Sequence, residues 1–209
     1  MPEDLDFPEA AGLVISAGTA YEGLVDRGKL RPGETVLITA ASGTVGSAAI
    51  QIAASTGARV FAVAGERSHD YVRGLGAEMV VDYRDRGFIE ALRRAVPNGF
   101  DVLFDGTGNE VRDQAFELVR TGGRGIFIAG NPPVREGVEI HAFFATVDAA
   151  RLQAVVRLVA EREASDAGRG GVPSRARTRG DKARCRAPGK GTSGGSRRSL
   201  TAEPQLSRV

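Results

Sequence analysis

Five short apolar runs alternate with amphipathic stretches along the central part of the chain. The runs are VLITA (36–40), VFAVA (60–64), MVVDY (79–83), DVLFD (101–105) and GIFIA (125–129). Nearly continuous apolar runs of this length are typical of parallel strands that are covered on both faces. Because helical spacing returns after each run, the pattern predicts right-handed βαβ crossovers and an α/β fold: a doubly wound parallel sheet, Rossmann-like.

The connections between the runs carry the spacing of helices that pack against a sheet. From Val45 to Ala53 the apolar residues recur at helical intervals, and Gly57 can take the left-handed conformation that ends a helix. Similar but less regular spacing predicts helices over 71–75, 88–96 and 111–119. The segment Val138–Phe144 is expected to be a sixth strand, and Asp148 is expected to cap one more helix that continues to Val159.

Composition divides the chain into three parts. Residues 1–30 are expected to form a helical segment that leads into a dinucleotide-binding domain over 31–163, and residues 164–209 a basic tail. The tail is rich in Gly, Ser, Pro and Arg and cannot bury enough apolar surface to offset the entropy of ordering it, so we expect disorder there. It holds 11 Lys and Arg against 3 Asp and Glu, whereas the whole chain has 28 against 26. The body is therefore mildly acidic, which argues against a nucleic-acid partner.

Several other classes of protein are disfavoured by simple counts. One cysteine, Cys185, cannot form an intramolecular disulfide, and with only His69 and His141 beside it no zinc tetrad can be built. We therefore expect no metal site. No apolar run approaches the roughly 20 residues of a membrane span, and the N-terminus is acidic rather than signal-like. A cytoplasmic protein with no membrane partner is the expectation.

The stretch TAASGTVG (39–46) joins the first apolar run to the first helix. Aligned from Ala41 it reads A-x-G-x-x-G, the dinucleotide-binding fingerprint with alanine in the first position. In that fingerprint the second glycine lets the diphosphate approach the backbone, and the third lets the helix pack on the strand. A strand-bend-helix context favours phosphate binding over an ordinary turn. The residues assigned to the diphosphate are Ser42, Gly43, Thr44, Val45 and Gly46.

The end of the second apolar run bears on the choice of nucleotide. NAD-binding forms place an acidic residue about 20 positions after the fingerprint, where it takes the ribose 2′-hydroxyl. Here Ala64 occupies that place, and Arg67 follows three residues later. An apolar residue followed by a cation favours a 2′-phosphate and hence NADPH. Glu66 argues for NADH, because it could itself reach a ribose hydroxyl.

Several stretches of the chain resemble a known protein family. PEAAGLVISAGTAYEGL (8–24), the glycine bend, LGAEMVVDYRD (75–85) and FDVLFDGTG (100–108) are similar to the zinc-independent quinone oxidoreductase branch of the medium-chain dehydrogenase/reductases, over residues 5 to about 162. The resemblance implies NADPH-dependent hydride transfer to a small-molecule quinone or enone substrate. It also implies a homodimer that pairs through an edge strand near 138–144.

The resemblance further implies roles for residues beyond the bend. Gly65, Arg67 and Tyr83 would lie near the 2′-phosphate; Thr107, Ala129 and Gly130 would line the nicotinamide side, and Thr19 would close the site. Purely structural explanations compete with some of these roles. Tyr83 fits a strand-end aromatic that shields the sheet equally well, and ordinary hydrogen bonding accounts somewhat better for Thr19 and Thr107. No catalytic acid or base is assigned.

Two departures from the family pattern leave the function open. Members of the family begin with a barrel-like domain that forms much of the substrate pocket, and this chain starts after almost all of it; the family's C-terminal strand and helix are replaced by the basic tail. The abrupt change to basic, low-complexity sequence suggests a shifted reading frame. The alternative is a disordered tail that contacts an anionic partner. The chain would then be a reductase domain with impaired catalysis, or a non-catalytic nucleotide-binding module that acts with a partner chain. A short-chain dehydrogenase is excluded because no tyrosine has a lysine four positions on.

Overall fold

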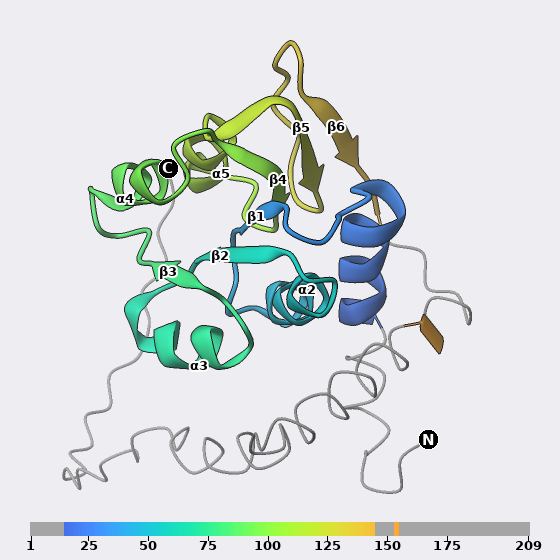
Figure 1. Ribbon diagram of the computed structural model, residues 1–209, viewed down its shortest axis with the longest axis horizontal. Coiled ribbons are helices and arrows are strands. Elements are labelled where there is room, and N and C mark those ends of the chain that lie inside the picture. Colours follow the sequence, from blue (N-terminus) through green and yellow to red (C-terminus); the bar gives the residue numbers. More distant parts are fainter. Residues whose placement is uncertain (1–14, 145–152, 155–209) are drawn as a thin grey trace, which may run out of the picture.

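The computed structural model describes residues 15–144 and 153–154 (Figure 1). Residues 15–21 are α-helical and continue directly into the π-helix η1 (Glu22–Arg27). The strands are β1 (Thr35–Ile38), β2 (Arg59–Val63), β3 (Met79–Val81), β4 (Phe100–Asp105), β5 (Val119–Phe127) and β6 (Glu139–Ala142). The helices between them are α2 (Thr44–Ser55), η2 (Glu66–Ser68), α3 (His69–Gly74), α4 (Phe88–Ala95) and α5 (Glu110–Phe116).

The strands of the described residues form one parallel sheet in the order β3-β2-β1-β4-β5-β6. This is the strand order of the Rossmann fold, so the predicted doubly wound parallel sheet is confirmed. The predicted sixth strand is also confirmed, slightly shorter than expected, at the edge beside β5. The strand order reverses between β1 and β4, and in such sheets ligands bind in the crevice at that point, beyond the carboxyl ends of the strands.

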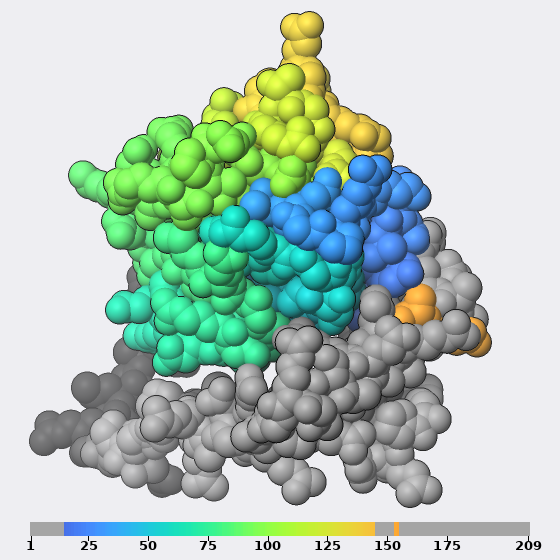
Figure 2. All heavy atoms as spheres, in the orientation of Figure 1, coloured from blue at the N-terminus to red at the C-terminus, as the bar shows by residue number. Residues whose placement is uncertain are grey.

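Helices cover both faces of the sheet and divide the core into two clusters. On one face Leu24 of η1 and Ile50 of α2 pack with Val36 and Ile38. On the other face Leu37 packs with the side chains of α4 and α5. Successive residues of β1 therefore point to opposite covered faces, which explains why its sequence is apolar throughout. Figures 1 and 2 show the N-terminal helix and α2 side by side on the first face.

The approach of the N-terminal helix to the sheet depends on a glycine. A Cβ atom on Gly23 would lie 2.6 Å from the ring of Phe104 in β4, so no larger residue fits there without movement. The neighbouring Glu22 is 1% exposed and forms an ion pair of 2.7 Å with Arg27. No described helix is long and apolar enough to cross a membrane.

The sequence pattern was wrong about where the fifth strand begins. It predicted a helix over 111–119, but α5 ends at Phe116 and Val119 already pairs with Phe100 of β4. The carbonyl of Leu118 accepts a hydrogen bond from the amide of Phe100, so a long-range strand pairing overrides the helical spacing. The predicted cap at Asp148 and the tail from residue 164 lie outside the described residues. The division of the chain at 30 and 163 remains a prediction.

Candidate nucleotide-binding site

The bend between β1 and α2 leaves the start of a helix open to solvent. Gly43 is the N-cap residue of α2, and among the described residues no side chain caps this helix start. Ser42, Gly43 and Thr44 are exposed. The first amides of a helix have no partner within the helix, and the dipole adds positive potential at the same end. This bend is therefore shaped to receive an anion.

The two glycines of the bend have different surroundings. A Cβ atom on Gly46 would lie 2.3 Å from the carbonyl oxygen of Ala40 and 2.8 Å from the Cα of Ala41, so only glycine lets α2 begin this close to the strand. A Cβ atom on Gly43 would meet a single neighbour, the Ala40 oxygen at 3.2 Å. Gly43 therefore keeps space open above the bend rather than inside the packing. These are the roles that the fingerprint assigns to its third and second glycines.

A buried carboxylate orders the loop after β4, directly beside the bend. Asp105 is fully buried and accepts hydrogen bonds from the Thr39 hydroxyl at 2.5 Å, the Thr107 hydroxyl at 2.6 Å and the Gly108 amide at 3.0 Å. Thr39 directly follows β1 and Asp105 is the last residue of β4, and these two strands flank the reversal of strand order. Asp105 was not predicted as a site residue, although it lies with its partners Thr107 and Gly108 in the stretch FDVLFDGTG (100–108).

The loops after β4 and β5 pack against each other. Gly108 has a φ of +64°, and a Cβ atom on it would lie 3.1 Å from the carbonyl carbon and oxygen of Ala129 and 3.2 Å from the nitrogen of Gly130. Arg112 of α5 donates a hydrogen bond to the carbonyl of Asn131 at 2.7 Å and so fixes the second loop from the other side. The structure thus brings together the three residues predicted for the nicotinamide side, Thr107, Ala129 and Gly130.

The carboxyl ends of β2 and β3 hold the residues predicted for the 2′-phosphate. Gly65 follows β2, and a Cβ atom on it would lie 3.3 Å from a guanidinium nitrogen of Arg84. The Arg84 guanidinium carbon lies 4.9 Å from the centre of the Tyr83 ring, which is exposed. Arg67 lies in η2 and is exposed, and within residues 15–144 it forms no ion pair. Arg84 was not predicted as a site residue, although it lies in the stretch LGAEMVVDYRD (75–85).

Asp82 sets the position of Arg84. Its carboxylate accepts hydrogen bonds from the Arg84 amide at 2.9 Å and the Glu66 amide at 3.0 Å, and it lies 3.9 Å from the Arg84 guanidinium. The Arg84 amide is the largest cause that holds the pKa of Asp82 below its usual range. The carboxylate is therefore ionised at neutral pH and ties the turns after β2 and β3 together. Ala64, at the position of the acid in NAD-binding forms, is buried.

Thr19 and the two histidines lie on three different elements, and the predicted role of Thr19 remains a prediction. The Thr19 hydroxyl donates to the carbonyl of Ile15 at 2.7 Å within its own helix. His69 Nε2 lies 3.2 Å from the carbonyl oxygen of Ala64, and His141 lies on the edge strand β6. Among the described residues no group of three or more His, Cys, Asp or Glu is placed to hold a metal ion.

Comparison with known proteins decides the family. The zinc-binding dehydrogenase family matches residues 44–165 of this chain, more than half of its length. The chain belongs to the zinc-binding dehydrogenase family. Among the medium-chain dehydrogenase/reductases it falls in the quinone oxidoreductase-like branch, as the motifs predicted.

Three relatives illustrate the match. The spectinabilin polyketide synthase system protein NorB of Streptomyces orinoci is 42% identical over 141 residues, which are 67% of this chain and 6% of NorB. The quinone oxidoreductase from Coxiella burnetii is 26% identical with a TM-score of 0.65, over 77% of this chain and 51% of that one. The CurK enoyl reductase is 29% identical with a TM-score of 0.63, over 83% of this chain and 55% of that one. The chain thus spans about half of these solved relatives and a small part of NorB.

The family's name refers to zinc, but the described residues do not fit a zinc site. Zinc in proteins takes three or four Cys, His or carboxylate ligands at one place. Here the two histidines lie on α3 and β6, and in the described part of the chain neither belongs to a group of three or more potential ligands, although Glu139 lies 3.0 Å from His141. A nicotinamide nucleotide fits the described residues much better. The start of α2 has no side-chain cap, and Gly43 keeps the space above it clear.

Proposed function

We propose that this chain binds NADPH and serves the transfer of a hydride to an electron-poor carbon of an α,β-unsaturated carbonyl or a quinone. The observation that carries the proposal is the open start of α2 at the reversal of strand order, flanked by the loops after β4 and β5. The relatives described above support an oxidoreductase domain with a nicotinamide cofactor. Zinc plays no part in the proposed reaction.

The proposal assigns each side of the site to one part of the nucleotide. The amides of Ser42 and of residues 44–46 would bind the diphosphate, because the Gly43 amide already donates to the Ala40 carbonyl. Arg67, Arg84 and Tyr83 would surround the 2′-phosphate beside Gly65. The loops that carry Thr107 and Ala129 would orient the nicotinamide. The cofactor supplies the hydride when bound, so the protein has only to bind, orient and exclude water.

Arg84 strengthens the preference for NADPH over NADH that Arg67 first indicated. Its guanidinium lies beside Gly65, near Asp82 and over the Tyr83 ring, where it could donate charge-assisted hydrogen bonds to a phosphate. The absence of an acid at Ala64 removes the usual partner of a free 2′-hydroxyl. Together these features favour a phosphorylated ribose.

An unsaturated carbonyl is the substrate class that we favour. The 42% identical relative is a polyketide synthase system protein, and the CurK structure is an enoyl reductase. Such substrates need little acid–base assistance, because hydride adds directly to an electron-poor carbon.

Titration of the purified chain with NADPH and with NADH, followed by nicotinamide fluorescence, tests the nucleotide assignment. We expect tighter binding of NADPH, and Arg84→Ala is expected to weaken NADPH binding by roughly tenfold, because a hydrogen bond to a charged group contributes about 1.5–3 kcal/mol. Arg67→Ala should act in the same direction. NADH binding should stay within about twofold of wild type in both variants.

Arg93→Ala is the matched control, because Arg93 pairs with Glu90 on the exposed side of α4 and lies on the other face of the sheet. It should leave both affinities unchanged. Equal affinity of the wild-type chain for NADPH and NADH would overturn the assignment.

A second measurement concerns catalysis. We expect this chain alone to show little turnover of NADPH with 9,10-phenanthrenequinone. If the chain binds NADPH but the NADPH is not oxidised even when a partner chain is added, the non-catalytic nucleotide-binding module would be favoured instead.

A further inference from the structure

We infer that Asp105 is the positioning residue of the nucleotide site: it locks the loop that orients the nicotinamide to the bend that binds the diphosphate. The inference rests on the proposed function and adds to it a group that touches neither substrate nor cofactor. Asp105 acts through the backbone and hydroxyl groups around it, all of which belong to the carboxyl ends of β1 and β4.

The hydrogen bonds of Asp105 span both loops. Its Oδ1 accepts from the Thr39 hydroxyl at 2.5 Å, from the Thr107 hydroxyl at 2.6 Å and from the Thr107 amide at 3.2 Å. Its Oδ2 accepts from the Gly108 amide at 3.0 Å. The Thr39 hydroxyl also accepts from the Gly106 amide at 3.2 Å, so one threonine and one aspartate close the loop over 106–108 onto β1.

Only a carboxylate satisfies this arrangement. Both oxygens of Asp105 face donors, and the side chain is fully buried. If the carboxylate were removed, each donor would lose its hydrogen-bond partner and no water would replace it. An asparagine of the same shape would turn its NH₂ group toward an amide or a hydroxyl hydrogen. The loop over 106–108 would then have to move away from the bend.

The loop held by Asp105 packs against the bend and against the loop after β5. Gly106 lies against Ala40, with 3.4 Å from its Cβ position to the Ala40 Cβ, and Gly108 lies against Ala129. Ala40 itself has a φ of +49°, a left-handed conformation that is unfavourable for alanine and persists only where surrounding contacts fix it. Asp105 therefore lies among three loops at the carboxyl ends of the strands, where the cofactor is proposed to bind; we call this end of the sheet the cofactor edge.

The bend has supports of its own that do not involve Asp105. The Gly43 amide donates to the Ala40 carbonyl at 3.0 Å, and the Ala41 amide donates to the carbonyl of Val63 in β2 at 3.2 Å. Close packing at Gly46 holds the start of α2. Removal of the Asp105 carboxylate should therefore displace the nicotinamide loops and leave the diphosphate bend in place.

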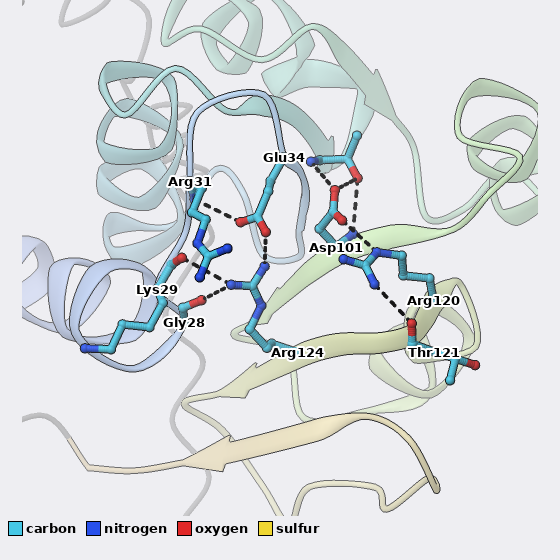
Figure 3. A network of polar contacts seen from close by, with 9 residues as sticks. Gly28, Lys29, Arg31, Glu34, Asp101, Arg120, Thr121 and Arg124 are labelled. Carbon is cyan, nitrogen blue, oxygen red and sulfur yellow. Dashed lines mark hydrogen bonds and ion pairs between the residues drawn. The ribbon is translucent and has the colours of Figure 1, made fainter.

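The chain contains a second threonine–aspartate pair that serves as an internal control. At the opposite end of the same two strands, Asp101 accepts hydrogen bonds from the Thr35 amide at 2.7 Å and the Thr35 hydroxyl at 2.9 Å. Figure 3 shows Asp101 at this amino-terminal edge, with Arg120 donating to it from β5. Both pairs tie β1 to β4, but only the Thr39–Asp105 pair lies at the cofactor edge.

The experiment compares Asp105→Asn with Asp101→Asn in the full chain. Each variant is titrated with NADPH and with adenosine 2′,5′-bisphosphate, which lacks the nicotinamide half, and its unfolding free energy is measured by urea denaturation. Asp105→Asn should weaken NADPH binding by at least about tenfold and leave adenosine 2′,5′-bisphosphate binding within about twofold. Asp101→Asn should leave both affinities within about twofold despite its own loss of stability.

The outcomes separate the inference from the proposed function. If the wild-type chain fails to bind NADPH, the proposed function is wrong. If the wild type binds and Asp105→Asn weakens both ligands equally, or acts no differently from Asp101→Asn, the positioning role is wrong. Thr39→Val removes one of these hydroxyls at nearly constant shape and is assigned no contact with the nicotinamide, so it provides the same split between the two ligands should Asp105→Asn not fold.

Discussion

At the residue scale, Gly43 and Gly46 separate binding from stability within a single motif. A Cβ atom on Gly46 would lie 2.3 Å from the Ala40 oxygen, a backbone atom that no side-chain rotation can move. Gly46→Ala should therefore lower the free energy of unfolding by roughly 1–3 kcal/mol, the usual cost of overpacking. Urea denaturation of the variant measures this loss directly.

Gly43→Ala should behave in the opposite way. Gly43 has a φ of −74°, which alanine adopts without strain, and the added Cβ would meet a single oxygen at 3.2 Å. We expect a change in stability below about 1 kcal/mol but a loss of NADPH affinity of about tenfold or more, because the methyl group occupies the approach to the bend. A Gly43→Ala variant that binds NADPH like wild type would show that the diphosphate does not lie over this glycine.

The limits of sequence reading are also clearest at single residues. The glycine bend could be recognised because all of its determinants lie within eight consecutive residues. Asp105 could not, because its role depends on Thr39, which is distant in sequence and becomes a neighbour only when β4 pairs with β1. Arg84 was overlooked for a similar reason: Asp82 and the turn after β3 place it beside Gly65.

At the scale of elements, the strands could be predicted because burial on both faces gives them continuous apolar runs. The start of β5 could not, since Leu118 and Val119 fit a helical spacing from Val111 as well as a strand. The pairing of Val119 with Phe100 decided between them, and the register between β4 and β5 shifts between Phe100 and Val102. Local periodicity carries no information about such a partner strand.

The junction of β1 and β4 at the amino-terminal edge makes stability depend on pH. Burial raises the pKa of Asp101, but the hydrogen bonds from Thr35 and Arg120 together outweigh burial and hold that pKa below its usual range. A carboxyl whose pKa is lower in the folded state stabilises the fold above its unfolded pKa of about 3.9, and the stabilisation is lost as the pH falls below that value. Asp101→Asn should therefore be less stable than wild type at pH 7.

The same variant should show a shallower loss of stability in acid. Urea denaturation between pH 7 and pH 3 would measure the difference in unfolding free energy between wild type and Asp101→Asn, which should narrow as the pH falls through the range in which Asp101 is protonated. A difference that stays constant over the whole range would mean that the carboxylate charge contributes nothing at this junction. Asp70→Asn is a suitable control, because Asp70 forms only an exposed pair with Arg73.

At the scale of the whole molecule, the proposed ligand bridges strands from both halves of the sheet. The bend follows β1, the 2′-phosphate residues follow β2 and β3, and the nicotinamide loops follow β4 and β5. A nucleotide bound across all of these ends should stabilise the sheet as one cooperative unit. By mass action, NADPH at about 100 times its dissociation constant should add about 2.7 kcal/mol to the free energy of unfolding.

Removal of residues 164–209 tests whether the tail takes any part in this unit. The composition of the tail predicts that it contributes no core, so the shortened chain should melt within about 2 °C of the full chain. NADPH should raise both melting temperatures by the same amount, roughly 5–10 °C for about 2.7 kcal/mol in a domain of this size. If the shortened chain kept its melting temperature but lost the shift with NADPH, the basic residues of the tail would have to reach the nucleotide's phosphates, and the boundary predicted at residue 163 would be wrong.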